Sequence, residues 1–575
     1  MTEKIVPAHG SRVARVDIPA DCKWRVSDIY IDETAWKEAC DELKAKLPVL
    51  SEFKGLLGDA KVMAAALMMQ DELAQMVEKI YAYARLQQDA DNTDQHMQAL
   101  SGEAEALAAE FSNTNSFIEP EILALDKEKL AEMLATEPAL ANYKYYIENL
   151  VRLADHILPA QMEELLAHSR LATGTAATAF RSLVSADMQF PKITDGNGNE
   201  ATVSEGNYLL NMTSSDRELR KNSFQGLMGT YNKYRNTLAS TLTGSCRSAN
   251  FYATAHKYPD TLTASLAADN IPTSLYDGLI QTVHDNLAPL HEYMQLKKDV
   301  LGFEELHPYD IYVPLSNAGN SFACDFDEAC EKIVDALQPL GEKYITTLKK
   351  GFSEGWIDIY ENKGKRSGAY SWGVYGVHPF VLLNYQKRYN SISTIAHEMG
   401  HAIHTYQSSA NQPFEKSQYT IFLAEIASTV NEVLLLKHLL KSTKDDNLKR
   451  YLLAYYMDMI RATLFRQTQF AEFEQQAHAM AEQGEPLTKD NLCQLYYRLN
   501  KEYYGDGIIH DEQIAYEWAR IPHFYNSFYV YKYATGIISA ISIVRAILSK
   551  EEGAVQRYFT FLQSGGKTDP VTILQ

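Results

Sequence analysis

The stretch His397-Glu398-Met399-Gly400-His401 is the part of this chain that best predicts its structure and chemistry, because its two histidines are four residues apart. On an α-helix, residues at i and i+4 lie on one face, so His397 and His401 can bind a single metal ion. Glu398 would then lie beside a metal-activated water, where the general base of a hydrolase is needed. The spacing therefore predicts a helix that carries a zinc site.

The residues around this motif are mostly apolar. They include Ile392, Ile395, Ala396, Ala402 and Ile403. A buried helix that carries His, Glu and His needs partners for those polar groups, and a metal ion supplies one. The alternative, a solvated helical face with two ordinary histidines, agrees less well with such apolar flanks.

A zinc hydrolase normally supplies three protein ligands, so a third donor is expected downstream. His404 lies seven residues from His397, about 10 Å along a helix axis, which is too far to share its ion. We therefore interpret His404 as a packed or supporting residue near the site. The apolar helical pattern over 422–432 is interrupted by Glu425 and Glu432, which are seven residues apart and share a face. One of these carboxylates can ligate the metal while the other supports the site.

Several segments along almost the whole chain resemble oligoendopeptidase F, in the wider group of thimet-oligopeptidase-like zinc metallopeptidases. They are Trp24-Arg25-Val26-Ser27-Asp28-Ile29-Tyr30, Phe117-Ile118-Glu119-Pro120-Glu121-Ile122 and Gly565-Gly566, together with the motif above. The resemblance implies one Zn²⁺ per chain and a third ligand, Glu425, placed 24 residues after His401. Glu432 then remains the supporting carboxylate. It also implies a chain that continues further past Gly566 than this one, which leaves open whether the C-terminus is truncated.

A glycine-containing segment before the motif also matches this family. Gly368-Ala369-Tyr370-Ser371-Trp372-Gly373 leads into 379–385, which resembles the strand at the edge of a substrate cleft. Such an edge can bind an extended peptide through main-chain hydrogen bonds, so Gly368, Ala369 and Tyr370 are predicted to contact substrate. The alternative is a plain Gly-rich hairpin.

The segment 523–533 contains one histidine followed by four tyrosines. The resemblance implies that His523 and tyrosines here bind substrate and stabilise the oxyanion that forms when water attacks a peptide carbonyl. We expect His523, Tyr529 and Tyr533 to act in catalysis and Tyr531 to contact substrate. The segment is shorter than the thimet oligopeptidase pattern, which leaves the individual tyrosines open. The alternative for Tyr525, Tyr529 and Tyr533 is an aromatic stripe that packs in the core.

Helical periodicity dominates the 575 residues, so the predicted fold is mainly α, with a small β-sheet beside the active-site helix. Predicted helices lie over 71–86, 97–115, 275–300, 326–348 and 447–483. Strand-like segments cover 183–193, followed by a turn at 195–198, and 368–377.

No low-complexity linker divides the chain, so the predicted boundaries are soft. They separate an N-terminal helical region (1–115), an intermediate helical and hairpin segment (116–195, an oligoendopeptidase F N-terminal domain by resemblance) and a catalytic metallopeptidase domain (196–575). The resemblance implies that the first part folds over the catalytic part and walls a deep channel. A deep channel would admit unfolded peptides and exclude folded proteins.

The net charge of −20 disfavours nucleic acid and anionic membranes as partners. Residues 1–20 alternate charges and lack the apolar core of a signal peptide, which predicts a cytoplasmic protein. The six cysteines show no CxxC pair, so we expect reduced thiols. The oligomeric state remains open.

The sequence thus predicts a zinc-dependent endopeptidase that hydrolyses internal bonds of short, unfolded peptides. A second hypothesis keeps the metal site but makes the enzyme a zinc carboxypeptidase or a peptidyl-dipeptidase, in which a cation such as Arg520 would capture the terminal carboxylate. A third, a peptide-binding module with structural zinc, would need a fourth ligand that is not evident near the motif.

Overall fold

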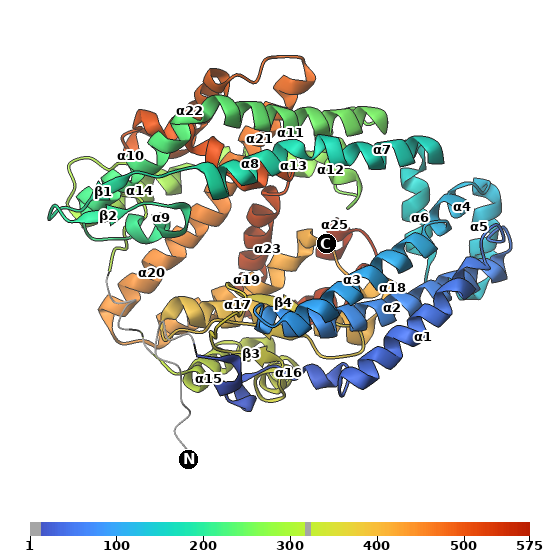
Figure 1. Cartoon of the computed structure of the whole chain (residues 1–575). Coiled ribbons are helices and arrows are strands. Elements are labelled where there is room, and N and C mark those ends of the chain that lie inside the picture. The colour runs from blue at the N-terminus through green and yellow to red at the C-terminus, as the bar shows by residue number, and fades with distance from the viewer. Residues whose placement is uncertain (1–12, 317–321, 323) are drawn as a thin grey trace. The chain divides into compact units, whose positions relative to one another are not determined.

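The computed structural model describes residues 13–316, 322 and 324–575. Its secondary structure is mostly helical, as predicted, with short strands in two small sheets. The chain divides into two compact units (Figure 1). Unit 1 contains the described parts of Met1–Ala154, Asn320–Lys441 and Ser539–Gln575, and unit 2 those of Asp155–Gly319 and Ser442–Ile538. The three-part division expected from the sequence stays a prediction.

Unit 1 contains the N-terminal helices and the helix with the His-Glu-Met-Gly-His motif. Its helices are α1 Glu33–Ser51, α2 Ala60–Ala90, α3 Gln95–Asn115, α4 Ile118–Leu123, α5 Lys127–Thr136, α6 Lys144–Leu153, α15 Phe326–Ala336, α16 Glu342–Ser353, α17 Tyr389–Asn411, α18 Phe414–Ser417, α19 Ile421–Ser442, α24 Ala554–Leu562 and α25 Pro570–Leu574. Helices α1, α2 and α3 lie side by side (Figure 1), and each begins at an aspartate whose carboxylate accepts backbone N–H bonds of the first turn.

A three-stranded sheet in unit 1 supports the motif helix. Its strands are β3 Ile357–Asp358, β4 Tyr370–Trp372 and β5 Phe380–Leu382, in the order β3-β5-β4. Strand β5 is central, parallel to β3 and antiparallel to β4, and it is fully buried. Helix α17 packs against β4 and β5, which confirms the predicted sheet beside the active-site helix. Strand β4 is shorter than the strand predicted over 368–377.

Unit 2 is a second helical assembly with one hairpin. Its helices are α7 Ala160–Thr173, α8 Thr175–Ser182, α9 Glu205–Met212, α10 Arg217–Lys233, α11 Arg235–Ala255, α12 Thr261–Ala267, α13 Thr273–His284, α14 Ala288–Leu301, α20 Asp446–Ile460, α21 Arg466–Glu482 and α22 Lys489–Tyr504. The hairpin pairs β1 Lys192–Thr194 with β2 Glu200–Thr202 around the predicted turn. The prediction of a strand over 183–193 is wrong in its first half, because 183–187 continues α8 as a π-helical turn.

Three helices predicted as continuous are interrupted. The 275–300 segment divides into α13 and α14, where Pro289 lies in the first turn of α14. The 326–348 segment divides at Gly341, which has a φ of +88°. The 447–483 segment contains a π-helical turn over Arg461–Phe465, between α20 and α21. Local breaks of this kind leave the apolar periodicity almost unchanged, so the sequence pattern does not reveal them.

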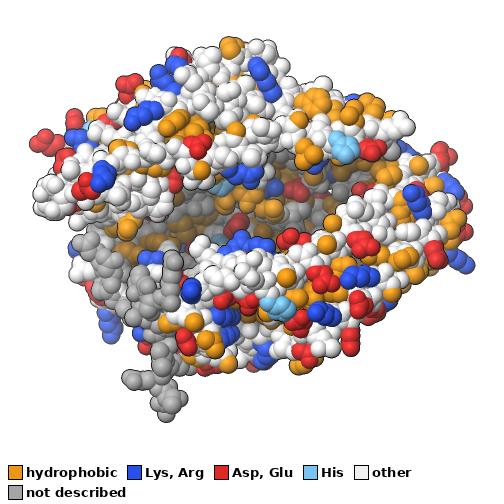
Figure 2. Space-filling view, in the orientation of Figure 1, with side chains coloured by type: hydrophobic (Ala, Val, Ile, Leu, Met, Phe, Trp, Pro, Cys, Tyr) orange, Lys and Arg blue, Asp and Glu red, His pale blue; other side chains and the backbone are white. Residues whose placement is uncertain are grey.

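Helix α23, Tyr531–Leu548, begins in unit 2 and ends in unit 1. It is the one helix among the described residues that is long and apolar enough to cross a membrane by length and composition, a test that core helices of soluble proteins also pass. On the face seen in Figure 2, basic and acidic side chains are interspersed with hydrophobic ones.

Candidate active site

Helix α17 carries His397, Glu398 and His401, as the spacing predicted. The Nε2 atoms of His397 and His401 are 3.2 Å apart. From α19, the Oε2 atom of Glu425 lies 3.5 Å from Nε2 of His397 and 3.7 Å from Nε2 of His401. The nearest point equidistant from these three atoms lies about 2.0 Å from each, which is the length of a zinc bond to nitrogen or carboxylate oxygen.

The three ligand side chains remain partly accessible, with 27% of His397, 18% of His401 and 28% of Glu425 exposed. An ion can therefore enter the site, and a non-protein ligand can share its coordination. The structure brings together the three residues predicted as ligands, and their donor set of two imidazoles and one carboxylate is one that zinc accepts.

Glycine at position 400 allows α17 and α19 to approach closely. A Cβ atom there would lie 2.6 Å from Cα of Ser428 and 2.7 Å from the carbonyl oxygen of Ala427, both backbone atoms of α19. The amide of Asn431 donates to the carbonyl of Ala396 at 2.9 Å, and the hydroxyl of Tyr344 donates to Asn431 at 2.7 Å. The distance between the two ligand-bearing helices is therefore set by backbone contact and a buried hydrogen-bonded bridge.

Glu432, predicted to support the site, contacts the first histidine of the motif. Its Oε1 lies 2.6 Å from Nδ1 of His397, which leaves Nε2 of that ring for the metal. The hydroxyl of Ser393, one helical turn before His397, donates to the other oxygen of Glu432 at 2.9 Å. Ser428 donates to Oε2 of Glu425 at 3.2 Å. These two serines orient the carboxylates and were not identified from the sequence.

His404 makes no hydrogen bond to a ligand. It is buried, and neither ring nitrogen has a partner among the described residues. Its ring stacks on Tyr419 with centroids 3.7 Å apart and also contacts Phe561. Burial lowers the pKa of His404 to about 3, so this ring is neutral. Of the two roles that the sequence left open for His404, packed or supporting, these contacts describe the packed one.

The site contains more acidic than basic side chains. Burial raises the pKa of Glu398 to about 7, and the carboxylates of Glu425 and Glu432 act in the same direction. Burial opposes protonation of His397, but the hydrogen bond and charge of Glu432 outweigh it and raise the pKa of His397 to about 9. Burial and the neighbouring His397 hold the pKa of His401 well below its usual value. Three carboxylates beside two imidazoles fit a bound cation.

Strand β4, which contains part of the segment predicted to contact substrate, lies at an edge of its sheet. Within the described sheet β4 pairs with β5 on one side, and its other side has no strand neighbour. Gly368, with a φ of +86°, and Ala369 line a cavity of about 270 Å³ that also contains Arg388 and Thr394 of the α17 region. Thr394 lies one turn before His397, so this cavity adjoins the metal-binding face of α17. The hydroxyl of Tyr370 donates to Asp89, which anchors the start of the strand.

His523, Tyr529 and Tyr533 form an aromatic cluster in unit 2. The centroid of the His523 ring lies 6.1 Å from that of Tyr529 and 6.0 Å from that of Tyr533, and the two tyrosine rings are 5.5 Å apart. Burial and the charge of Arg466 lower the pKa of His523. All three side chains are only partly buried.

The other two tyrosines of this segment pack inside unit 2. Tyr531, predicted to contact substrate, is completely buried against Tyr276 with ring centroids 5.1 Å apart, so the structure gives that prediction no support. Tyr525 stacks on Phe180 and shares a hydrogen bond with Thr241. Tyr525 thus packs as the core-packing alternative describes, whereas the roles of Tyr529 and Tyr533 stay predictions.

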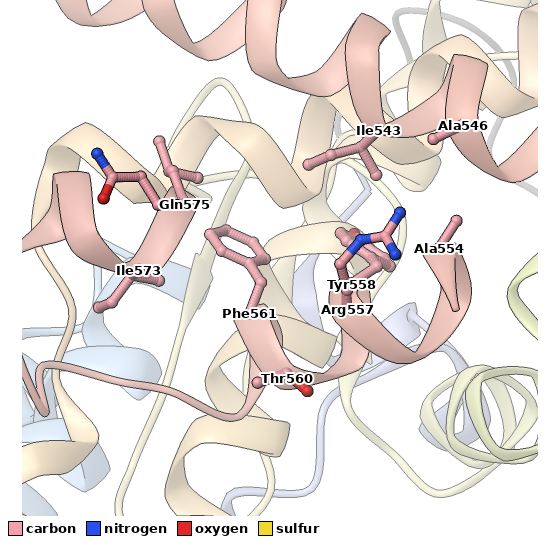
Figure 3. A pocket seen from close by; sticks show the side chains of 10 residues that line it. Ile543, Ala546, Ala554, Arg557, Tyr558, Thr560, Phe561, Ile573 and Gln575 are labelled. Atoms are coloured by element: carbon pink, nitrogen blue, oxygen red, sulfur yellow. The ribbon is translucent and has the colours of Figure 1, made fainter. Parts of the chain in front are cut away.

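A different cavity of about 280 Å³ lies in unit 1 among the second half of α23, α24 and α25 (Figure 3). Ile543, Phe561 and Ile573 give it a mostly apolar lining, and Arg557 at its rim pairs with Glu551. None of the predicted site residues lines it, so it has no part in the chemistry considered below.

The fold and the His-His-Glu site define a mainly helical, metal-dependent hydrolase. Residues 210–575 match the model of peptidase family M3, and residues 121–190 match that of oligopeptidase F. The chain is 39% identical to oligopeptidase PepF of Bacillus subtilis, over 98% of this chain and 84% of that protein. It is 38% identical to the group B oligopeptidase PepB of Streptococcus agalactiae, over 97% and 93%. The structure of oligoendopeptidase-F from Enterococcus faecium superposes with a TM-score of 0.71 and 35% identity, over 94% of this chain and 93% of that one.

The chain therefore belongs to peptidase family M3, in its oligoendopeptidase F group, and is a metalloendopeptidase. The family predicted from the sequence is confirmed.

Proposed function

We propose that this metalloendopeptidase uses one Zn²⁺, bound by His397, His401 and Glu425, to hydrolyse internal peptide bonds of short, unfolded peptides. The triangle of two Nε2 atoms and one Oε2 atom carries this proposal, because its edges of 3.2, 3.5 and 3.7 Å would allow one zinc ion to contact all three atoms. When bound there, Zn²⁺ would supply Lewis acidity, which polarises a carbonyl and lowers the pKa of water.

Glu398 is the proposed general base. It lies next to His397 on α17 and is buried, with 7% of the residue exposed. Its carboxylate would take the proton of the attacking water and deliver it to the leaving amine. A raised pKa near neutrality suits a group that both accepts and donates a proton.

Substrate binding is proposed to use the free side of β4 near Gly368, Ala369 and Tyr370. Main-chain pairing at such an edge binds peptides with little dependence on their side chains. His523, Tyr529 and Tyr533 would donate hydrogen bonds to the oxyanion, a role for which imidazole and phenol groups are suited. The names of the relatives, which are oligopeptidases, support short peptides as the substrate class. A cytoplasmic location remains part of the proposal.

The exopeptidase alternative receives no support from Arg520. Its guanidinium pairs with Glu205 at 2.6 Å and lies 3.8 Å from Glu517, within unit 2. A cation that is already neutralised by two carboxylates is poorly placed to capture a substrate carboxylate.

This proposal is tested by measuring cleavage of an internally quenched peptide of about ten residues, blocked at both ends. Cleavage is measured for the untreated enzyme, after a chelator is added, and after zinc is restored. Cleavage that the chelator abolishes and zinc restores would support the proposal, and product masses would locate the cut. Cleavage that appears only when the C-terminus is free would instead support an exopeptidase.

A further inference from the structure

Phe528 is one of few non-glycine residues with a left-handed backbone, at a φ of +58°. A bulky residue in that conformation is unfavourable, so the surrounding structure must hold it there. Phe528 directly precedes Tyr529, and its ring is buried against His478 and Tyr276. The left-handed conformation of Phe528 therefore determines the direction in which the backbone enters Tyr529, and with it the orientation of the Tyr529 side chain.

The backbone amide of Phe528 is bound by a buried carboxyl group. The N–H of Phe528 donates to Oε1 of Glu474 on α21 at 2.8 Å. Glu474 is buried, with 2% exposed, and its Oε2 has no hydrogen-bond partner among the described residues. Burial raises the pKa of Glu474 to about 8, and the N–H bond only partly opposes that effect, so the side chain is mostly neutral at pH 7. A buried carboxyl without an ion pair is costly, and among the described residues Glu474 makes its hydrogen bond to this loop amide.

The remaining residues of the 523–530 loop are also anchored, except those of the aromatic cluster. Phe524 packs on Phe470 and Phe473, the Tyr525 hydroxyl bonds to Thr241, and the Ser527 carbonyl accepts from Ser265. His523 and Tyr529 instead face each other at the partly exposed side. Their relative position thus depends on how the backbone between them is held.

We propose that Glu474 is a positioning residue that clamps the amide of Phe528 and thereby holds His523 and Tyr529 in the geometry needed to bind the oxyanion. This inference rests on the proposed function. Glu474 does not itself touch the substrate; it acts by holding Tyr529 in position. The carboxyl and a glutamine amide both offer an oxygen to the Phe528 N–H, whereas a leucine of similar size offers none.

The variants that test this are Glu474→Gln, Glu474→Leu and a matched control, Glu472→Leu. Glu472 lies on the same helix and is also buried, but it bonds to His284, Tyr503 and Gln476 rather than to the loop. We expect E474Q to keep kcat within about threefold, and E474L to lower kcat by about 10- to 100-fold with little change in KM. E472L should lower the melting temperature and leave kcat near the wild-type value.

Two further readouts separate positioning from general destabilisation. Hydrogen exchange in 524–530 should be faster in E474L but not in E474Q or E472L. The loss of kcat in E474L/Y529F should equal that of the larger single variant, because both changes remove the same interaction. Three results would each overturn this inference but leave the proposed function intact. They are equal kcat in E474L and E472L, unchanged hydrogen exchange in 524–530 of E474L, and a kcat loss in E474L/Y529F equal to the product of the two single losses. A wild-type protein without metal-dependent cleavage would overturn the proposed function, and this inference with it.

Discussion

Replacing Gly400 by alanine tests whether the metal site depends on the close approach of α17 and α19. The added Cβ would lie 2.6 Å from Cα of Ser428 and 2.7 Å from the carbonyl oxygen of Ala427. Ordinary contact needs about 3.4 Å, so the helices must separate by about 0.8 Å near the site. No side chain can rotate away to relieve this contact, because both obstructing atoms belong to the backbone of α19.

Glu425 lies one turn from Ser428 on α19, so it would move with that helix relative to His397 and His401. Metal sites tolerate displacements of about 0.2 Å in ligand distance, which is far less than the required separation. We expect G400A to bind zinc about 10- to 100-fold more weakly, a loss of about 1.4–2.8 kcal/mol. Competition with a chromogenic chelator measures this affinity, and peptide cleavage at limiting and at saturating zinc shows whether activity follows occupancy.

Gly278 provides the control, because it lies inside α13 and an added Cβ there meets nothing within 4 Å. G278A should bind zinc as the wild type does and gain about 0.5–1 kcal/mol in unfolding free energy from the better helix propensity of alanine. The reasoning is refuted if G400A matches G278A in zinc affinity, since the distance between α17 and α19 would then not limit the site.

Three other changes have defined expected outcomes. E398Q should retain zinc, measured by elemental analysis, while turnover of the blocked peptide falls by at least about a hundredfold; substantial activity in the zinc-loaded variant would contradict the role of general base. E432Q weakens the hydrogen bond to Nδ1 of His397 and should lower zinc affinity about tenfold in the chelator assay, and unchanged affinity would contradict this role. Burial raises the pKa of Glu474 from 4.5 to about 8, so between these pH values the folded chain keeps a proton that the unfolded chain releases. Stability should therefore fall as pH rises through this window, by up to about 5 kcal/mol at 1.36 kcal/mol per pKa unit. In E474Q this dependence is absent, so its melting temperature should rise relative to wild type from pH 5 to pH 8 and then level off; a constant difference would mean that Glu474 is ionised in the folded protein.

The sequence could predict that the three proposed metal ligands lie together, because their signal is local. His397 and His401 share a helix, and Glu425 interrupts an apolar helical pattern where a buried carboxylate needs a cation. The supporting Glu432 follows from the same periodicity. Ser393 also had a signal, since it lies four residues before His397 and thus on the same face, but serine is too common in helices for that spacing to be informative.

Other features could not be predicted because they depend on contacts between distant parts of the chain. The need for glycine at position 400 comes from the backbone of α19, and the buried bridge joins Tyr344 on α16 to Asn431. The burial of Tyr531 and the partial exposure of Tyr529 depend on which helices surround α23 and the preceding loop. A tyrosine-rich sequence does not distinguish these environments, because tyrosine suits both core and surface.

The two sets of proposed functional groups differ in how their positions are determined. His397, His401 and Glu425 lie within long helices, where backbone hydrogen bonds and the contact at Gly400 hold each ligand. His523 lies in a single short 3-10 helix, Pro522–Tyr525, and Tyr529 lies outside any helix, so their relative position depends on side chains elsewhere in unit 2. A site that must be held to within about 0.5 Å requires such support wherever a loop provides the reacting groups. Burial of the Glu474 carboxyl carries a free-energy cost that grows as pH rises from 4.5 to about 8, and holding the Phe528 amide gives a physical reason for a carboxyl, rather than an apolar side chain, to occupy that position.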